Sequence, residues 1–411
     1  MKKLEVDFAG WGERWLLGTL AETGRQILFE YSPEARRQAL ELSPLRLPLS
    51  HPGAFTGENF FFGLPGLIAD ALPDGWGLLL MDRAFSGAGR RPMDTSPLDR
   101  LAFIGERAMG ALAFRPPDPV ALEAENLDLA RLAAEVDLVL AEAPVEQALR
   151  HLLLLGGSPQ GARPKVLVDF DAATGRISSG KAAPGAAPWL VKFPAREEHR
   201  DACAIEELYA RLARHCGLEM PESRFFDLEG NHGAFGVRRF DREGESRIPL
   251  LSLSALLHVD YRLPALDYEM LLRATRRLTG DEREVARAFE RCVLNVLLHN
   301  RDDHSRNLAF RLDRERRWRL APVFDLTFCA GPGGEHQTSV AGEGRAPTRA
   351  HLLEVARRSG IELKSARAII DRLLEGVSAL PALAADLPIR KRRLAEIRRI
   401  LAEDWRRAGE T

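Results

Sequence analysis

One polar stretch, residues 299–307, constrains the fold of this chain more than any other. It reads His-Asn-Arg-Asp-Asp-His-Ser-Arg-Asn, and Phe324-Asp325 follows it beyond a hairpin-like return. An apolar helical pattern that begins near Arg283 runs into the stretch, and a short alternating segment, 308–312, leaves it. A doubly acidic loop between two buried elements is a place where a rigid scaffold presents reactive side chains.

The spacing of three side chains in this region matches the catalytic loop of kinases. Asn307 lies five positions after Asp302, and Asp325 comes after the return. In that pattern the first Asp orients a hydroxyl nucleophile, while the Asn and the second Asp bind magnesium. Asp303 competes with Asp302 for the role of base, but the separation from Asn307 favours Asp302. The alternative is a turn rich in Asp and Asn that caps helices, which is the better interpretation of any one of these residues alone.

The region upstream has the element order of the ATP-binding lobe of a kinase. The expected elements are a Gly-containing loop at 156–161, strands at 166–170 and 189–193, a helix at 202–216, and strands at 223–228 and 234–240. Only seven of the 58 cationic residues are lysines. Lys192, on a strand, is therefore a candidate to bind ATP phosphates, held in place by Glu206 or Glu207 on the helix. Lys165 either reaches a phosphate or only caps its strand, and Phe240 lies at an adenine hinge or in the core.

Composition excludes several classes of protein. Hydrophobic residues make up 45% and charged residues 28%, and the net charge of -1 creates no overall field for nucleic acid or an anionic membrane. The four cysteines form no CxxC motif or disulfide framework, which suits a reducing compartment. No signal-peptide core and no run of ~20 apolar residues occurs, so a cytoplasmic location without membrane contact is expected.

Four motifs, taken together, carry a resemblance to a known family. They are Asn-Arg-Asp-Asp-His-Ser-Arg-Asn (300–307), Ala-Pro-Val-Phe-Asp-Leu (321–326), Val-Arg-Arg-Phe-Asp-Arg (237–242) and Ser-x-x-Gly-Ala-x-x-Lys (158–165). This set resembles the HipA toxin kinases of bacterial type II toxin–antitoxin systems. The likeness extends to the expected meander at 3–31 and the Leu-Pro-Asp turn at 72–74, so it covers nearly the full length.

The resemblance implies an α+β, two-lobe protein-kinase-like (HipA-like) fold. The N-terminal half would be mixed α/β with a small β-rich subdomain, and the C-terminal lobe would be all-helical. The expected domains are an N-terminal subdomain at 1–118, a helical connector at 119–149, an ATP-binding N-lobe at 150–245 and a helical C-lobe with the catalytic loop at 246–411. We expect the charges of the acidic helical stretch 120–149 to form a solvated face and not a binding site. The Arg-rich helix 388–407 is either a solvated amphipathic helix or a basic contact face for a partner or DNA.

Carried over to this chain, the resemblance implies Asp302 as the base and Asn307 and Asp325 as Mg²⁺ ligands. The implied ATP contacts are Gly161, Ala162, Arg163, Lys165, Lys192, Glu206, Arg238, Phe240 and His304. His304 is alternatively a packed histidine that orders the loop. Ser158 falls on the loop serine whose autophosphorylation inactivates these kinases, because the added charge repels the ATP phosphates. The chain departs from the family at Arg238, where Glu is common, and at Arg163-Pro164.

Two alternatives to a protein kinase toxin remain open. The resemblance implies a serine/threonine kinase that acts on a translation component such as an aminoacyl-tRNA synthetase. A helix-turn-helix (HipB-like) antitoxin would neutralise it, and DNA would be contacted only through that antitoxin. A small-molecule or lipid kinase is the first alternative, since Asp-x-His-x-x-Asn does not distinguish the acceptor. A degenerate repressor-partner module without activity is the second, and the presence of Lys192, Asp302, Asn307 and Asp325 together argues against it.

The implied regulatory serine generates a prediction. Ser158→Ala is expected to remove autophosphorylation while leaving phosphotransfer to another protein intact, because only the modified side chain is lost. Phosphopeptide mass spectrometry of the protein after incubation with ATP checks this, and a modification found on a different residue contradicts the assignment.

Overall fold

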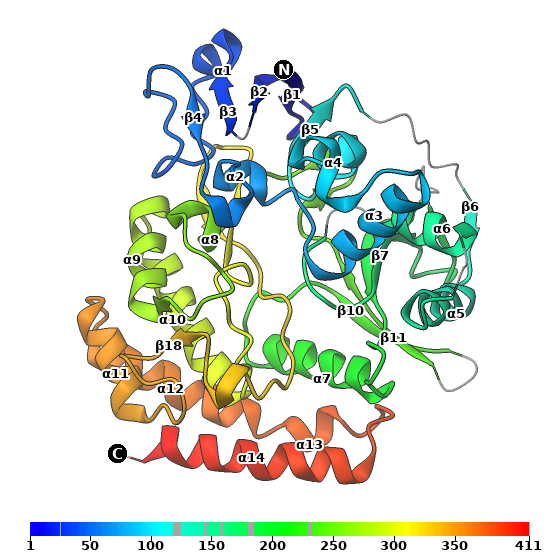
Figure 1. Cartoon of the computed structure of the whole chain (residues 1–411). Helices are drawn as coiled ribbons and strands as arrows, with labels where there is room; N and C mark the ends of the chain where they lie inside the picture. The colour runs from blue at the N-terminus through cyan, green and yellow to red at the C-terminus, as the bar shows by residue number, and fades with distance from the viewer. Residues whose placement is uncertain are drawn as a thin grey trace. The chain divides into compact units, whose positions relative to one another are not determined.

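The computed structural model describes residues 1–24, 26–117, 125–143, 146–156, 159–179, 185–228 and 232–410 (Figure 1). Contacts divide the chain into two compact units. The first comprises residues 1–203, 224–251 and 255–258, and the second comprises 204–223, 252–254 and 259–411. The domain boundaries expected from the sequence divide the chain more finely and stay predictions.

An antiparallel sheet of five strands, in the order β4-β3-β2-β1-β5, forms the first part of the first unit. Its strands are β1 (Lys2–Phe8), β2 (Trp15–Thr23), β3 (Gln26–Tyr31), β4 (Phe55–Thr56) and β5 (Leu112–Arg115). The helices between β3 and β5 in the sequence are α1 (Pro33–Gln38), α2 (Gly66–Ala69), α3 (Gly75–Gly87) and α4 (Pro97–Ile104), with 3-10 turns η1 (Asn59–Phe61), η2 (Pro92–Asp94) and η3 (Gly105–Arg107). Alternation buries Leu4, Val6 and Phe8 on β1. This pattern is why the meander of β1 to β3 was predictable.

A second sheet, in the order β10-β11-β9-β7-β8-β6, contains the strands expected to bind a nucleotide. The strands are β6 (Glu125–Leu127), β7 (Lys165–Phe170), β8 (Ile177–Ser179), β9 (Ala187–Lys192), β10 (Ser223–Asp227) and β11 (Gly233–Arg238). The helices α5 (Leu129–Leu140) and α6 (Glu146–Gly156) lie between β6 and β7 in the sequence. The described part of the expected helical connector, 125–143 and 146–149, contains β6, α5 and the start of α6, and its role as a connector stays a prediction. β6 pairs with β8, and α5 buries Leu132, Val136 and Val139. Three residues of strand are too short to show a period in the sequence.

A buried carboxylate, Asp241, joins the end of β11 to the loop before β5 within the first unit. Arg239 donates to it through Nε at 2.9 Å and Nη2 at 2.8 Å, and Arg242 Nη1 donates at 2.6 Å. The backbone N–H of Gly110 donates a further bond at 2.9 Å. Burial raises the pKa of Asp241, but the two guanidinium groups and the Gly110 N–H outweigh it and hold the pKa well below its ordinary value. The carboxylate is therefore ionised at neutral pH.

The second unit is mainly helical. Its helices are α7 (Asp201–His215, from Ala204 on), α9 (Tyr268–Thr279), α10 (Glu282–Leu297), α11 (Arg349–Arg358), α12 (Leu363–Val377), α13 (Leu380–Leu383) and α14 (Lys391–Gly409), with a 3-10 turn, η5 (Pro332–Gly334). The hairpin β12 (Arg242–Glu243) and β13 (Ser246–Arg247), then β14 (Leu250–Ser252) and α8 (Leu253–Leu257), precede α9 in the sequence. The apolar pattern expected from about Arg283 corresponds to α10. Asp281 caps this helix by accepting from the Arg283 N–H at 2.9 Å.

Short strands make the second unit less purely helical than expected. The hairpin-like return after the polar stretch is formed by β16 (Ala309–Leu312) and β17 (Trp318–Leu320), which pair antiparallel. In addition, β15 (Leu266–Asp267) pairs in parallel with β18 (Thr338–Ser339). Such two-residue pairings depend on partners remote in the chain, and the sequence carries no periodic signal for them.

The C-terminal helix α14, red in Figure 1, is amphipathic as the sequence suggested. It buries Ile397, Leu401 and Ala408, while Arg392 and Arg398 are exposed. In the described part of the chain, no helix is both long and apolar enough to cross a membrane.

The Asp241 cluster generates a prediction about stability. Asp241→Asn is expected to lower the free energy of unfolding by about 3 kcal/mol at pH 7, because buried guanidinium groups lose their anion. The pKa of folded Asp241 is depressed, so the wild-type advantage is fully present above about pH 4 and declines as the pH falls towards that depressed value. Urea unfolding at pH 7 and at acid pH measures both effects. The exposed-residue control Glu13→Gln is expected to change stability by less than about 0.5 kcal/mol.

Candidate active site

The first residues of the polar stretch after α10 are anchored by buried side chains. His299 Nδ1 lies 2.7 Å from Asp404 Oδ2 on α14, and its ring stacks on Phe328 at 5.2 Å. Arg301 is buried and donates to the backbone carbonyl oxygens of Gly334 and Arg345. Residues 299 and 301 thus face the protein interior, and the loop between α10 and β16 has a defined course.

Asp303 is the third anchor, and its carboxylate is completely buried. Tyr268 Oη donates to Oδ2 at 2.7 Å, and His336 Nδ1 lies 2.8 Å from the same oxygen. The backbone N–H groups of Gln337 and Thr338 donate to Oδ1 at 2.8 and 3.2 Å. Burial and the nearby Asp303 carboxylate raise the pKa of Tyr268 well above its ordinary value, so its hydroxyl stays a donor. With four partners in a closed site, Asp303 has a structural role.

Asp302 differs sharply from its neighbour, because its side chain is 45% exposed. Gln337 Nε2 donates to Asp302 Oδ1 at 3.0 Å. His304 Nε2 lies 4.0 Å from the same oxygen, which is beyond hydrogen-bond distance. A base must be reachable by its substrate, and of the two adjacent carboxylates only Asp302 meets that condition. Exposure thus distinguishes Asp302 from Asp303, and the role of Asp302 as the base stays a prediction.

Asn307 and His304 complete the loop. The Asn307 amide donates from Nδ2 to the Asp302 carbonyl oxygen at 2.8 Å. Since only the NH₂ group can face a carbonyl, Oδ1 is the atom that points away from it. His304 Nδ1 accepts from the Arg306 N–H at 3.2 Å, and its ring packs 5.6 Å from Tyr261. These contacts fit the interpretation of His304 as a residue that orders the loop, while its contact with ATP stays a prediction.

Asp325 follows β17 in an unusual backbone conformation. Its φ is +57°, in the left-handed region that few residues other than glycine adopt, although Asp is among the more tolerant ones. The chain before it is fixed, because the Val323 N–H donates to the Glu219 carbonyl at 2.7 Å and the Ala321 N–H donates to the Ala309 carbonyl at 2.9 Å. This conformation aims the carboxylate away from the direction that an ordinary strand would give it.

The donor atoms of Asn307 and Asp325 suit a magnesium ion, which prefers oxygen ligands and usually takes only one or two carboxylates from the protein. Among the described residues, no group of three or more His, Cys, Asp or Glu side chains could hold a metal ion by itself. A site of one amide and one carboxylate would be completed by phosphate and water oxygens. The donor chemistry of the two residues fits the implied ion, and their role as magnesium ligands stays a prediction.

In the first unit, two lysines lie opposite each other on neighbouring strands. Lys165 on β7 pairs in register with Lys192 on β9, and Phe235 on β11 pairs with Lys192 from the other side. Both lysines are buried, and Lys192 Nζ lies 5.9 Å from the centre of the Phe235 ring. Lys165 Nζ donates to the backbone carbonyl oxygen of Gln160, so this side chain contacts the predicted nucleotide loop. Binding of phosphate by either lysine stays a prediction.

The predicted nucleotide loop is held by the N-terminal end of α3, where Asp74 is the N-cap residue. The N–H of Gly161 donates to Asp74 Oδ1, and the Trp76 N–H donates to the Gly161 carbonyl at 3.3 Å. Gly161 has a φ of +108°, and a Cβ there would collide with Lys165 Nζ. Arg163 forms an ion pair with Glu198 at 2.7 Å. Ala162 lies against Gly75, where an added Cβ would be 2.6 Å from the Ala162 Cα. The departure at Arg163 thus adds a tether to the loop.

Glu206 and Glu207 on α7 are the two candidate partners of Lys192. Glu207 is committed to Arg211, 2.8 Å away, and to the Ser223 hydroxyl at 2.6 Å, which leaves Glu206 as the better partner for a lysine. Glu206 is buried in the second unit, whereas Lys192 belongs to the first, and their pairing stays a prediction.

The roles predicted for Arg238 and Phe240 at the adenine hinge, and for Ser158 in the nucleotide loop, stay predictions. Arg238 is exposed at the end of β11 and Phe240 is half-buried, and their adenine contacts stay predictions. Ser158 lies outside the described residues.

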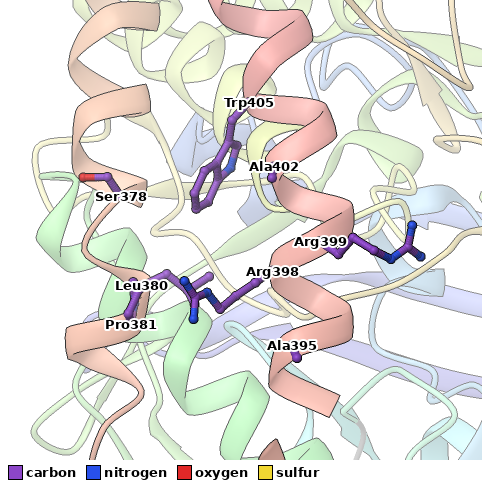
Figure 2. Close-up of a pocket in the computed structure, with 8 residues that line it drawn as sticks. All are labelled: Ser378, Leu380, Pro381, Ala395, Arg398, Arg399, Ala402 and Trp405. Carbon is purple, nitrogen blue, oxygen red and sulfur yellow. The ribbon is translucent and has the colours of Figure 1, made fainter. Parts of the chain in front are cut away.

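A pocket of about 420 Å³ lies elsewhere in the second unit, between α13 and α14 (Figure 2). Leu380 and Pro381 line one side, and Arg398 and Trp405 line the other. It contains none of the residues predicted for catalysis or nucleotide binding. The candidate site is therefore defined by its side chains and not by this pocket.

Sequence reasoning missed Tyr268, His336 and Gln337. They come from α9 and from the segment at β18, and both reach the polar stretch only through tertiary contacts. The sequence offered no signal for Tyr268. A faint one existed at His336-Gln337, a polar pair inside the helical half of the chain.

Two families of known domains match this chain. The HipA-like C-terminal domain matches residues 157–380, and the HipA N-terminal domain matches residues 11–115. Among solved structures, the chain is similar to HipA from a Shewanella oneidensis toxin–antitoxin complex of HipA, HipB and operator DNA, with a TM-score of 0.71 and 16% identity over 98% of this chain and 96% of that one. This likeness confirms the predicted α+β, HipA-type fold.

A curated relative matches over a shorter part. A protein named as a putative kinase from Haemophilus influenzae is 25% identical over 150 residues, which are 32% of this chain and 43% of that protein. The match thus spans less than half of the relative's length.

The contrast between the two adjacent carboxylates generates a prediction. Asp303→Asn is expected to lower the free energy of unfolding by about 3 kcal/mol, since an amide NH₂ would face donors in a buried site. Asp302→Asn, at the exposed position, is expected to change it by less than about 0.5 kcal/mol. Urea unfolding of both variants decides the matter, and equal losses would contradict the division of roles between Asp302 and Asp303.

Proposed function

The chain belongs to the HipA family, and from this premise we propose that it is an ATP- and magnesium-dependent protein kinase that phosphorylates serine or threonine. The observation that carries the proposal is the pair Asp302 and Asp303. One carboxylate is exposed and oriented by an amide, while its neighbour is buried and fixes the backbone. A non-catalytic binding module has no need of an exposed carboxylate held in this way.

In the proposed reaction, a hydroxyl oxygen of the acceptor protein attacks the γ-phosphorus of ATP. A new phosphorus–oxygen bond forms, the bond to the β,γ-bridging oxygen breaks, and ADP leaves. Asp302 orients the hydroxyl and accepts its proton. Asn307 and Asp325 would hold Mg²⁺, which when bound neutralises charge on the phosphates. Lys192 would bind the α- and β-phosphates, and Lys165 on the adjacent strand supplies a second positive charge.

We extend the proposal to the protein that the kinase phosphorylates and to the way in which its activity is controlled. By similarity to the family, the acceptor would be a translation component such as an aminoacyl-tRNA synthetase, and Ser158 would be autophosphorylated. The similar S. oneidensis protein is found with HipB and its operator DNA. On that basis we propose that a helix-turn-helix antitoxin binds this chain and that DNA is contacted only through the antitoxin.

The proposed base generates the central prediction. Asp302→Ala is expected to reduce phosphotransfer by at least about 100-fold and to abolish growth arrest on expression, because the acceptor hydroxyl loses its base. The measurement is incubation of the protein with γ-labelled ATP, Mg²⁺ and cell lysate, followed by separation of labelled polypeptides. Glu315→Ala, an exposed carboxylate in the β16–β17 turn, is the control and is expected to retain activity.

The same experiment separates the competing functions. A labelled polypeptide that disappears with Asp302→Ala supports the protein kinase. Label confined to small molecules or lipids would favour the alternative acceptor class, and an absence of ATP binding in calorimetry would favour the degenerate module. Normal activity of Asp302→Ala would overturn the mechanism.

A further inference from the structure

We propose that Gln337 is a positioning residue for Asp302, the proposed base; this inference rests on the proposed function. Gln337 Nε2 donates to Asp302 Oδ1 at 3.0 Å, a normal hydrogen-bond length. An ionised carboxylate has two oxygens and rotates about its χ2 angle. A donor fixed on one oxygen selects a single orientation and so directs the other oxygen towards the acceptor hydroxyl.

The proposed role requires that Gln337 itself be held firmly, and its backbone is. Its N–H donates to Asp303 Oδ1 at 2.8 Å and also approaches the Arg301 carbonyl oxygen at 3.3 Å. The neighbouring residues are fixed by the same carboxylate, since His336 Nδ1 lies 2.8 Å from Asp303 Oδ2 and Thr338 Oγ1 donates to the Asp303 carbonyl at 2.5 Å. Asp303 thus locks the segment that carries Gln337.

Arg301 anchors the same segment on both sides of Gln337. Its guanidinium group donates to the carbonyl oxygens of Gly334 and Arg345, which lie on either side of Gln337 in the sequence. Three consecutive residues of the loop, 301–303, therefore contact segment 334–345. Arg301 and Asp303 hold its backbone, and the side chain of Asp302 meets the side chain of Gln337.

The chemistry of an amide suits this role better than that of a lysine or arginine would. A cation at this distance would form an ion pair with Asp302 and stabilise its negative charge, so that the carboxylate would become a weaker proton acceptor. The neutral Gln337 amide orients the carboxylate and leaves its negative charge in place. His304, 4.0 Å from Asp302 Oδ1, is too far away to form a hydrogen bond with that oxygen. The segment after Asp325 thus supplies a hydrogen-bond donor to the proposed base.

The test is a kinetic comparison of Gln337→Met, which keeps the length of the side chain but removes its donor. The rate of label transfer from γ-labelled ATP and Mg²⁺ is measured with dephosphorylated casein as acceptor and with the protein itself. We expect kcat to fall about 10- to 100-fold while KM for ATP changes less than about twofold. Gln337→Asn, which keeps the amide but is too short to reach Asp302, is expected to behave alike.

A double-mutant cycle separates positioning from a general structural effect. In the Asp302→Asn background, Gln337→Met is expected to cause no further loss, because there is no carboxylate left to orient. Ser339→Ala, which removes a hydroxyl from the same segment without contact to Asp302, is expected to retain the wild-type rate. Melting temperatures of all variants show whether each is folded.

The outcomes distinguish this inference from the proposed function. A wild-type protein that transfers no phosphate to any acceptor overturns both. An active wild type whose Gln337→Met and Gln337→Asn variants have unchanged kcat overturns the positioning role alone. A loss in Gln337→Met that adds fully to the loss in Asp302→Asn also overturns it, because independent effects do not act through Asp302.

Discussion

The candidate site depends on the hydrogen bonds that the buried carboxylate of Asp303 forms. An ionised group in a closed interior costs several kcal/mol unless hydrogen bonds replace the water that it loses. Here Tyr268 from α9, His336 and the backbone of Gln337 and Thr338 replace that water. Because these donors come from two segments remote from the loop, the carboxylate can be buried only when α9, the loop and the β18 segment are assembled together.

The first unit uses the same physical solution at Asp241. Its carboxylate is also buried and accepts from Arg239, Arg242 and the backbone of Gly110. In both units a buried acid lies directly beside the residue predicted to function, Asp302 in one and Phe240 in the other. The buried charge fixes the backbone, and the adjacent side chain is thereby held where a substrate or nucleotide is expected to meet it.

Patterns of local origin were predictable. The alternation in β1 and the apolar faces of α10 and α14 were visible because the period of a strand or helix is imprinted on neighbouring residues. The strand β6 and the β15–β18 pair were not, since strands of two or three residues show no period. Lys192 stood out by its rarity as a residue type, but its position opposite Lys165 required the register of β7 and β9.

The sequence by itself determined the spacing of Asp302, Asn307 and Asp325, and hence the class of chemistry that the loop suggests. It also contained two adjacent acids whose roles could be separated only by counting residues. The tertiary structure decided which acid is buried and which is exposed. Asp303 is completely buried, whereas the side chain of Asp302 is 45% exposed. Which acid faces the interior depends on donors from α9 and residues 336–338, and contacts between distant segments leave no mark on the local sequence.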